Sequence, residues 1–178
     1  REEGFSRRDM NPWVLRSHRL ACEAQEKGIL KDISYEVIEG CDRDEGIRPR
    51  MSERLLDRLP GVLQKDGLIT AGNACLTNDG AAFVLLCSER YAAMHGLQPK
   101  AEFVGMTEVG ADPSKSPKTA VLAIQDLLKR YHLTEQDIDI FECNEAFAVI
   151  DMLFARAFPK SLEKYNIFGG ALAYGHPY

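Results

Sequence analysis

The stretch DIDIFECNEAFA, residues 137–148, passes from one hydrophobic period to another within a single short segment. Ile138 and Ile140 alternate with acidic residues, which predicts a strand over 137–142. The following residues predict a helix over 145–158. Asn144 stands at the junction, where its side chain could cap the helix. A second interpretation is a carboxamide held at a helix entrance, able to position a water or to donate to an oxyanion.

The same change of period recurs on both sides of this stretch. An alternating pattern predicts a strand at 32–38, and a continuous apolar run at 81–87 predicts a strand covered on both faces. A further strand is expected at 101–109, and residues 166–174 read as a last strand or an extended turn. Helices are predicted at 88–95, which Gly96 ends, and at 119–131. Strands that alternate with helices predict an α/β architecture in which helices cover the sheets.

The N-terminal part of the chain predicts a helix over 11–28. Asn11 would be its N-cap, Pro12 its first helical residue and Gly28 its end. A competing start at Ser6 pairs this residue with Asp9 three positions later, but places Pro12 inside the helix. Farther along we expect a charged irregular loop at 40–50, a short helix at 52–59 and turns at 66–77.

Composition narrows the class of protein. The 178 residues are 45% hydrophobic and 28% charged, the balance of a globular domain. The net charge of −5 argues against a nucleic-acid partner, and no apolar run reaches the roughly 20 residues of a membrane span. Because Arg1 opens the chain and no secretory pattern follows, we expect the sequence to begin inside a longer polypeptide.

The five cysteines are scattered and form no C-x-x-C pair. This usage predicts free thiols in a reducing compartment, so we expect a cytoplasmic protein. His18 and Cys22 could share a helical face and bind a metal, but two ligands do not make a site and we predict none. Cys87, within its apolar run, is interpreted as a small buried hydrophobe. Cys75 and Cys143 adjoin the informative motifs, but the sequence shows no base that would activate either thiol.

His176 is the second residue with candidate chemistry. It lies in GGALAYGHPY, residues 169–178, between Gly175 and Pro177, where the backbone has little freedom. It could be a turn histidine, a general base, an oxyanion donor, or both of the last two. The glycine-rich loop at 72–80 could cradle a phosphate, but it lacks the P-loop and dinucleotide spacings.

Taken in order, three segments resemble the signature series of the second half of a thiolase. They are TAGNACLTNDGAA at 70–82, DIDIFECNEAFA at 137–148 and GGALAYGHP at 169–177, and RSHRLA and CDRDEGIR also fit. The resemblance implies an α/β, layered αβαβα architecture, present here as an incomplete portion. In the family's layout, residues 1–70 would be the remainder of the loop domain that covers coenzyme A. Residues 71–97 would be the last strand and helix of the N-terminal core domain, and 98–178 an incomplete C-terminal core domain.

The resemblance also implies an activity. Thiolases join or cleave acyl units through a cysteine thioester, as acetyl-CoA acetyltransferases or 3-ketoacyl-CoA thiolases, with coenzyme A as substrate and no tightly bound cofactor. His176 matches the histidine that activates the nucleophilic cysteine and contributes to an oxyanion hole. Asn144 matches the asparagine that orients a water to complete this hole.

Five further residues would contact coenzyme A by the same resemblance. Arg48 matches an arginine near the adenine end, and Ala71 and Cys75 match positions that touch the pantetheine. Ala146 and Phe147 would line the pantetheine tunnel.

The chain departs from the family pattern in three places. Cys75 stands where serine is frequent, Phe168 stands where asparagine is frequent, and the loop at 112–117 is shorter than in biosynthetic thiolases. These departures bear on acyl-chain length more than on the class of reaction.

Neither of the family's two catalytic cysteines matches a cysteine of this sequence. The nucleophile belongs upstream of Arg1 and the acid/base cysteine downstream of Tyr178. We therefore expect a fragment that is inactive alone, with a homo-oligomer or a complementing thiolase segment as partner. The alternative is a non-catalytic acyl-CoA-binding or assembly module of the same fold. A decarboxylating condensing enzyme is a weaker possibility, because such enzymes usually carry a second histidine where NEAFA stands.

Overall fold

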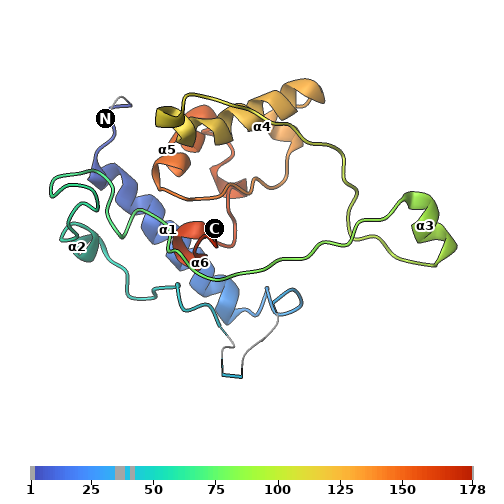
Figure 1. The fold of residues 1–178 in the computed structure, drawn as a ribbon, viewed down its shortest axis with the longest axis horizontal. Coiled ribbons are helices and arrows are strands. Elements are labelled where there is room, and N and C mark those ends of the chain that lie inside the picture. Colours follow the sequence, from blue (N-terminus) through green and yellow to red (C-terminus); the bar gives the residue numbers. More distant parts are fainter. Residues whose placement is uncertain (1–2, 35–38, 41–42, 178) are drawn as a thin grey trace.

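The computed structural model describes residues 3–34, 39–40 and 43–177. Within these residues helices are the regular elements (Figure 1). The α-helices are α1 (Arg7–Glu26), α2 (Glu53–Leu56), α3 (Glu89–Met94), α4 (Thr119–Arg130), α5 (Val149–Ala157) and α6 (Ala171–Tyr174). The 3₁₀ helices are η1 (Pro113–Lys118), η2 (Glu135–Asp137) and η3 (Leu162–Lys164).

Helix α1 runs through the middle of the molecule and begins earlier than the favoured prediction. Ser6 is its N-cap: the Ser6 hydroxyl accepts from the Asp9 N–H, and the Asp9 carboxylate accepts from the Ser6 N–H at 2.7 Å. This capping box satisfies the first orphan donors of the helix, so Pro12 is carried inside it. The predicted cap at Asn11 was wrong: Asn11 lies inside α1, and its amide donates to the carboxylate of Asp57 at 2.9 Å.

The predicted end of this helix is confirmed. Gly28 follows the C-cap with a positive φ of 65°, a conformation that glycine adopts without strain. The Ile29 N–H then donates back to the carbonyl of Ala24 at 3.1 Å, which closes the last turn.

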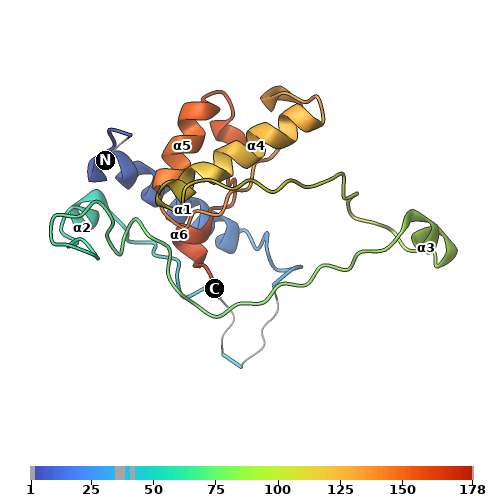
Figure 2. The same cartoon turned by 45° about the horizontal axis from the view of Figure 1, so that its top comes forward.

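Two apolar clusters form the core around α1, α5 and α6. One joins Met10 and Val14 of α1 to Leu172 of α6. The other is aromatic and contains Phe154 and Tyr165, whose rings stack with centroids 4.0 Å apart. Figures 1 and 2 show α6 lying against α1, with α4 and α5 next to each other above them. This packing places the segment before α5 and the segment after α6 beside one another.

Several other helix predictions are confirmed with small shifts. The predicted helix at 52–59 is the shorter α2, the one at 88–95 is α3, and the one at 119–131 is α4. The helix expected at 145–158 instead begins at Val149, with Ala148 as its N-cap. Asn144 is therefore not a helix cap, and that interpretation was wrong.

The predicted strands are the largest difference from expectation. Residues 81–87 and 101–109 are extended but belong to no strand, and Leu85 is 91% exposed. A strand needs a hydrogen-bonded neighbour, and in the described part of the chain only isolated bridges occur. Residues 32–33 belong to a turn, and residue 34 has no regular structure. The rest of the strand predicted at 32–38 lies outside the described residues.

The two strands predicted near the core, at 137–142 and 166–174, are not formed either. Of the strand expected at 137–142 there remains one parallel bridge, between Phe141 and Tyr165. The last segment, expected to be a strand or an extended turn, is a turn at 166–170 followed by α6. The Gly170 N–H donates to Ser17 Oγ at 3.0 Å, which holds the segment against α1 directly before α6 begins.

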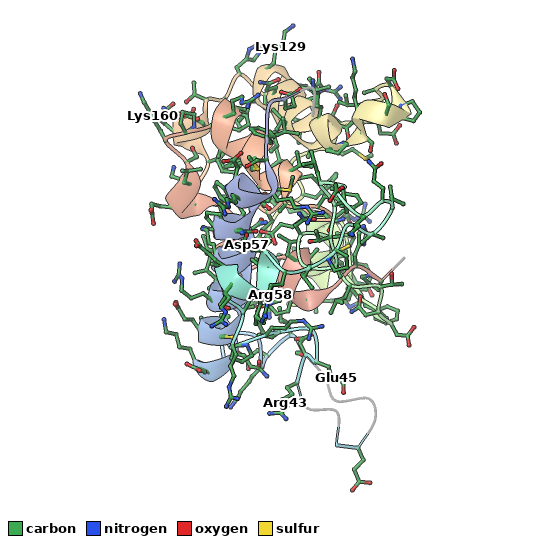
Figure 3. All side chains as sticks on the ribbon, turned by 90° about the vertical axis from the view of Figure 1, so that its left-hand side faces the viewer. Arg43, Glu45, Asp57, Arg58, Lys129 and Lys160 are labelled. Atoms are coloured by element: carbon green, nitrogen blue, oxygen red, sulfur yellow. The ribbon has the colours of Figure 1, made fainter. Side chains whose placement is uncertain are left out.

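Charged side chains lie over the outside of the molecule. Figure 3 shows Lys129 and Lys160 projecting from the α4–α5 side, while Arg43 and Glu45 lie at the opposite end. None of the described helices combines the length and apolarity that a membrane crossing requires. In the same residues, no three histidine, cysteine or acidic side chains gather as metal ligands.

Candidate functional site

Three segments that are distant in sequence meet beside α6. The Cys75 N–H donates to the carbonyl of Ala146 at 3.0 Å, and the Ala148 N–H donates to the carbonyl of Asn73 at 3.0 Å. On the other side of the same segment, the His176 N–H donates to the carbonyl of Leu76 at 2.8 Å. The three motifs singled out in the sequence therefore form one structural unit.

Asn144 and His176 face one another at this junction. The Asn144 Nδ2 and the His176 Nε2 lie 2.8 Å apart, although the two residues are separated by 32 positions. The Asn144 side chain is exposed and the His176 ring is half-buried, so a ligand can reach both. The two residues that the sequence singled out for chemistry are thus in direct contact.

Backbone geometry places the His176 ring. Helix α6 ends at Tyr174, and Gly175 follows with a φ of 95°, which favours glycine. A Cβ at Gly175 would also collide with the side chain of Asn78, which donates from Nδ2 to the carbonyl of Tyr174 at 3.2 Å. A larger residue at this position would displace the histidine.

Beneath the pair lies a buried polar cluster that sequence reasoning missed. It consists of Ser17 from α1, Glu145 and Asn166, and we call it the Glu145 cluster. Ser17 Oγ donates to Glu145 Oε2 at 2.6 Å, and Asn166 Nδ2 donates to Glu145 Oε1 at 2.9 Å. The sequence did offer one signal for this cluster: Glu145 is a charged residue within the apolar part of the NEAFA motif, and a charged residue that is buried needs partners.

A second buried carboxyl group lies next to this cluster. Asp151 accepts a hydrogen bond from the Tyr165 hydroxyl at 2.6 Å, and its Oδ2 has no partner among the described residues. Burial, followed by the nearby Glu145 carboxylate, raises the pKa of Asp151 well above its usual value. Burial and Asp151 likewise raise the pKa of Tyr165. The protonated form of Asp151 spares the cluster a second buried negative charge.

A hollow opens next to Asn144. Its volume is about 420 Å³, and its lining comes from Leu30, from the segment before α5 and from both ends of α6. Glu142, Cys143 and Asn144 form one wall, and the segment from Phe168 to Ala171 forms another. Burial, together with the charge of Glu145, raises the pKa of the Glu142 carboxyl. The hollow gives a small ligand access to the amide of Asn144.

None of the thiols whose pKa is shifted here is activated as a nucleophile. Burial, followed by the neighbouring Asp151, raises the pKa of Cys143 to about 12. Burial also raises the pKa of Cys75 and of Cys22. A nucleophilic cysteine needs a lowered pKa or an adjacent base, so these three thiols do not fit that role.

The remaining predicted site residues divide into two places. Cys75, Ala146 and Phe147 lie at the junction, where Phe147 is 37% exposed and Ala74 forms an antiparallel bridge with it. Ala71 is exposed at the turn that leads into this segment.

Arg48 lies apart, in an exposed loop with a hollow of about 410 Å³ formed by residues 47–51 and Leu55. The loop is attached to α1, because the Arg48 N–H donates to His18 Nδ1 at 3.2 Å. It also approaches α6, since a Cβ at Gly46 would lie 2.5 Å from the Ala173 carbonyl. The loop that carries Arg48 therefore packs against α1 and against α6 just before His176, while its hollow and the hollow beside Asn144 have different linings.

Comparison with known protein families shows which family this chain belongs to. Residues 1–90 match the model of the thiolase N-terminal domain, and residues 97–178 match the model of the thiolase C-terminal domain. The chain belongs to the thiolase family, which confirms the resemblance read from the motifs.

The chain is similar along its whole length to named relatives. It is 37% identical to a Synechocystis acetyl-CoA acetyltransferase, covering 99% of this chain and 46% of the relative. It is also 37% identical to a probable acetyl-CoA acyltransferase of Staphylococcus aureus, with 98% and 46% covered. The chain therefore spans about half the length of the curated relatives it matches.

Solved structures agree with the family. The chain superposes on the crystal structure of the Bacillus anthracis acetyl-CoA acetyltransferase with a TM-score of 0.91 at 33% identity, over 99% of this chain and 46% of the other. A human mitochondrial 3-ketoacyl-CoA thiolase in complex with CoA gives 0.88 at 35% identity, with 99% and 45% covered. The chain thus follows the path of an α/β thiolase fold over a portion of it, as predicted.

Proposed function

We propose that this chain supplies the histidine and the asparagine of a thiolase acyl-transfer centre that acts on coenzyme A thioesters. The observation that carries the proposal is the 2.8 Å contact between Asn144 Nδ2 and His176 Nε2 at the meeting point of three motifs. Support comes from relatives named acetyl-CoA acetyltransferase and from a similar thiolase solved with CoA.

The two side chains suit the two demands of acyl transfer. A neutral imidazole takes the proton of a thiol, so that the resulting thiolate can attack the carbonyl carbon of a thioester. The attack forms a carbon–sulfur bond and places negative charge on the carbonyl oxygen. The C=O bond forms again when the carbon–sulfur bond to coenzyme A breaks, and the leaving thiolate takes up the proton that the imidazole holds. In our proposal His176 handles the proton and donates to that oxygen, and Asn144 orients a water toward it.

The thiol for this reaction is proposed to come from outside the 178 residues. Cys143, Cys75 and Cys22 all have a raised pKa, which disfavours the thiolate that the attack requires. We therefore propose that the chain by itself does not cleave acyl-CoA. Activity would require the other half of a thiolase, in one polypeptide or in a complementing chain, and an oligomer of such units.

Coenzyme A is proposed to bind as a substrate rather than as a tightly held cofactor. Arg48 would meet the adenine end, and Ala71, Cys75, Ala146 and Phe147 would meet the pantetheine. The position of Arg48 in a hollow separate from the junction supports an extended ligand of this kind. We also propose the boundary between the two core domains near residue 97, and a reducing, cytoplasmic location, which the free thiols of Cys22, Cys75, Cys87 and Cys143 support.

The test joins this chain to the segments of the Synechocystis relative that lie outside the match. The chimaera is expected to cleave acetoacetyl-CoA in the presence of coenzyme A, and His176→Ala is expected to lower its turnover by on the order of a hundredfold or more. His95→Ala is the matched control, because His95 is an exposed histidine at the end of α3, 49 positions before Asn144, and it should leave turnover unchanged. Near-normal activity of the His176 variant would refute the proposed role.

A non-catalytic acyl-CoA-binding module is the second candidate, favoured by the raised pKa values of the three thiols. Calorimetric titration of the unmodified chain with acetyl-CoA separates the candidates when it is combined with the chimaera. Binding by the chain and no cleavage by the chimaera would support the module. Robust cleavage of acetoacetyl-CoA by the 178-residue chain alone would overturn our proposal that the thiol comes from elsewhere.

A further inference from the structure

Glu145 is a buried carboxylate with donors from three separate segments. It is only 1% exposed. Besides the Ser17 hydroxyl and the Asn166 amide, the backbone N–H of Leu172, in the first turn of α6, donates to its Oε2 at 3.4 Å. The approach is close, since a Cβ at Gly170 would lie 2.6 Å from the Glu145 carboxyl carbon. A buried charge is tolerated only with such a set of donors.

These donors attach Glu145 to both halves of the Asn144–His176 pair. Asn144 is the residue directly before Glu145, and Asn166 fixes the residue before that one: its Oδ1 accepts from the Cys143 N–H at 2.8 Å and its Nδ2 donates to the Cys143 carbonyl at 2.9 Å. His176 follows α6, whose first turn is held by Glu145 and by the Gly170 N–H donating to Ser17 Oγ at 3.0 Å. One carboxylate thus ties together the two segments that carry the pair.

The cluster requires an acceptor on both oxygens of residue 145. Oε2 receives the Ser17 hydroxyl and the Leu172 N–H, while Oε1 receives the Asn166 amide. A glutamine has nearly the same shape, but its NH₂ group only donates. In either orientation that NH₂ would face a donor, so Glu145→Gln removes part of the cluster without removing volume.

We infer that Glu145 is a positioning residue, which holds Asn144 and His176 in contact through the Glu145 cluster. The inference rests on the proposed function, because it is there that the Asn144–His176 pair is given its role in acyl transfer. The contact held by Glu145 also fixes the tautomer of the His176 ring, which can be measured without an activity assay. Asn144 Nδ2 can only donate, so in the chain without substrate His176 Nε2 accepts and the proton of the neutral ring lies on Nδ1. In the proposed acyl transfer, Nε2 is the nitrogen that exchanges this donor for the thiol proton.

The experiment measures the tautomer of His176 by nitrogen NMR of the unmodified 178-residue chain, labelled at histidine, at pH 8. In the parent chain the Nδ1–H form should be the major species. In Glu145→Gln it should become the minor species, because the segment that carries Asn144 shifts away from α6. Glu163→Gln changes an exposed glutamate in the same way and should leave the Nδ1–H form dominant.

Circular dichroism shows whether the variants keep their helices. If Glu145→Gln does not fold, Ser17→Ala decides, because it removes one donor from the carboxylate and retains the charge. A fall in the Nδ1–H fraction in a folded variant supports the inference, and an unchanged tautomer in a folded variant overturns it. Loss of turnover in the chimaera with an unchanged tautomer would also overturn it, while the proposed function would stand.

Discussion

Two regions of the molecule are rich in apolar residues and differ in how they bury them. The helical body consists of α1, α5 and α6 with the turns around them, and the α3 arm consists of residues 81–103 (Figures 1 and 2). In the body, Phe154 and Tyr165 have no exposed surface. In the arm, Phe83 is 96% exposed and Leu85 is 91% exposed. The arm runs away from the body in both views and returns near α4.

The two regions differ in whether their hydrogen bonds join distant segments of the chain. In the body, side chains join segments that are far apart, as Ser17 joins α1 to Glu145 across 128 positions. In the described residues of the arm, the backbone hydrogen bonds are local: they lie in and around α3, which Ser88 caps by accepting the Tyr91 N–H at 3.2 Å. An apolar run therefore becomes core only where a second segment supplies the other face.

Hydrogen exchange should show the largest contrast between the two regions. The amides of 81–87 have no backbone acceptor in the part of the chain that the structure describes, and those of α1 are helical and packed. We expect the α1 amides to exchange at least about a thousandfold more slowly, since local opening is nearly free and core opening approaches the global free energy of unfolding. Exchange mass spectrometry resolves the two segments. Equal protection of residues 81–87 and α1 would show that the arm is covered, as in a second copy of the chain.

Truncating one phenylalanine in each region gives the next largest effect. Phe154 is fully buried against three aromatic rings, with Phe141 and Phe158 each 5.2 Å away between centroids. Phe154→Ala should lower the free energy of unfolding by about 3–5 kcal/mol. Phe83→Ala is the matched control and should change it by about 0.5 kcal/mol or less. Urea denaturation followed by circular dichroism measures both, and a large loss in the Phe83 variant would place that ring in a packed interface.

The sequence predicts those parts of this fold that depend on near neighbours. Gly28 ends α1, and Ser88 and Gly96 bound α3, because capping and left-handed glycine are properties of a few adjacent residues. The choice of Asn11 over Ser6 as the start of α1 was wrong although the deciding signal is local: the Ser6–Asp9 capping box begins the helix in spite of Pro12 inside it. Strands depend on distant partners, so the pattern at 81–87 predicted a sheet that the described residues do not form.

The candidate site divides in the same way. Asn144 and His176 stood out because their motifs are specific in order and spacing, and the structure brings them into contact. Ser17 and Asn166 could not be assigned in advance, because their partner Glu145 lies 128 and 21 positions away. Their role depends on three segments meeting, which no local pattern describes. The contacts with coenzyme A stay predictions of the family resemblance.

The loop that carries Arg48 is intermediate between the helical body and the α3 arm: it is exposed like the arm but attached to the body at His18. The His18 ring is buried and its Nδ1 accepts the Arg48 N–H at 3.2 Å. Burial, followed by the charge of Arg48, lowers the pKa of His18 from 6.5 to about 4. In the unfolded chain His18 takes up a proton near its usual pKa of 6.5, whereas the folded chain resists it down to about 4. The stability that neutral His18 contributes is therefore complete above pH 6.5 and is lost as the pH falls toward 4.

This linkage gives the smallest predicted effect. Between pH 7 and pH 4.5 we expect His18 to account for a loss of about 1–2 kcal/mol in the free energy of unfolding, after a reduction for solvent screening. His18→Asn places an amide oxygen where Nδ1 accepts and cannot be protonated in this range, so its loss should be smaller by that amount. Urea titrations of both chains at the two pH values measure the difference. Parallel pH profiles would mean that His18 is solvated in the folded chain, and that the Arg48 loop is no more firmly attached to the body than the α3 arm.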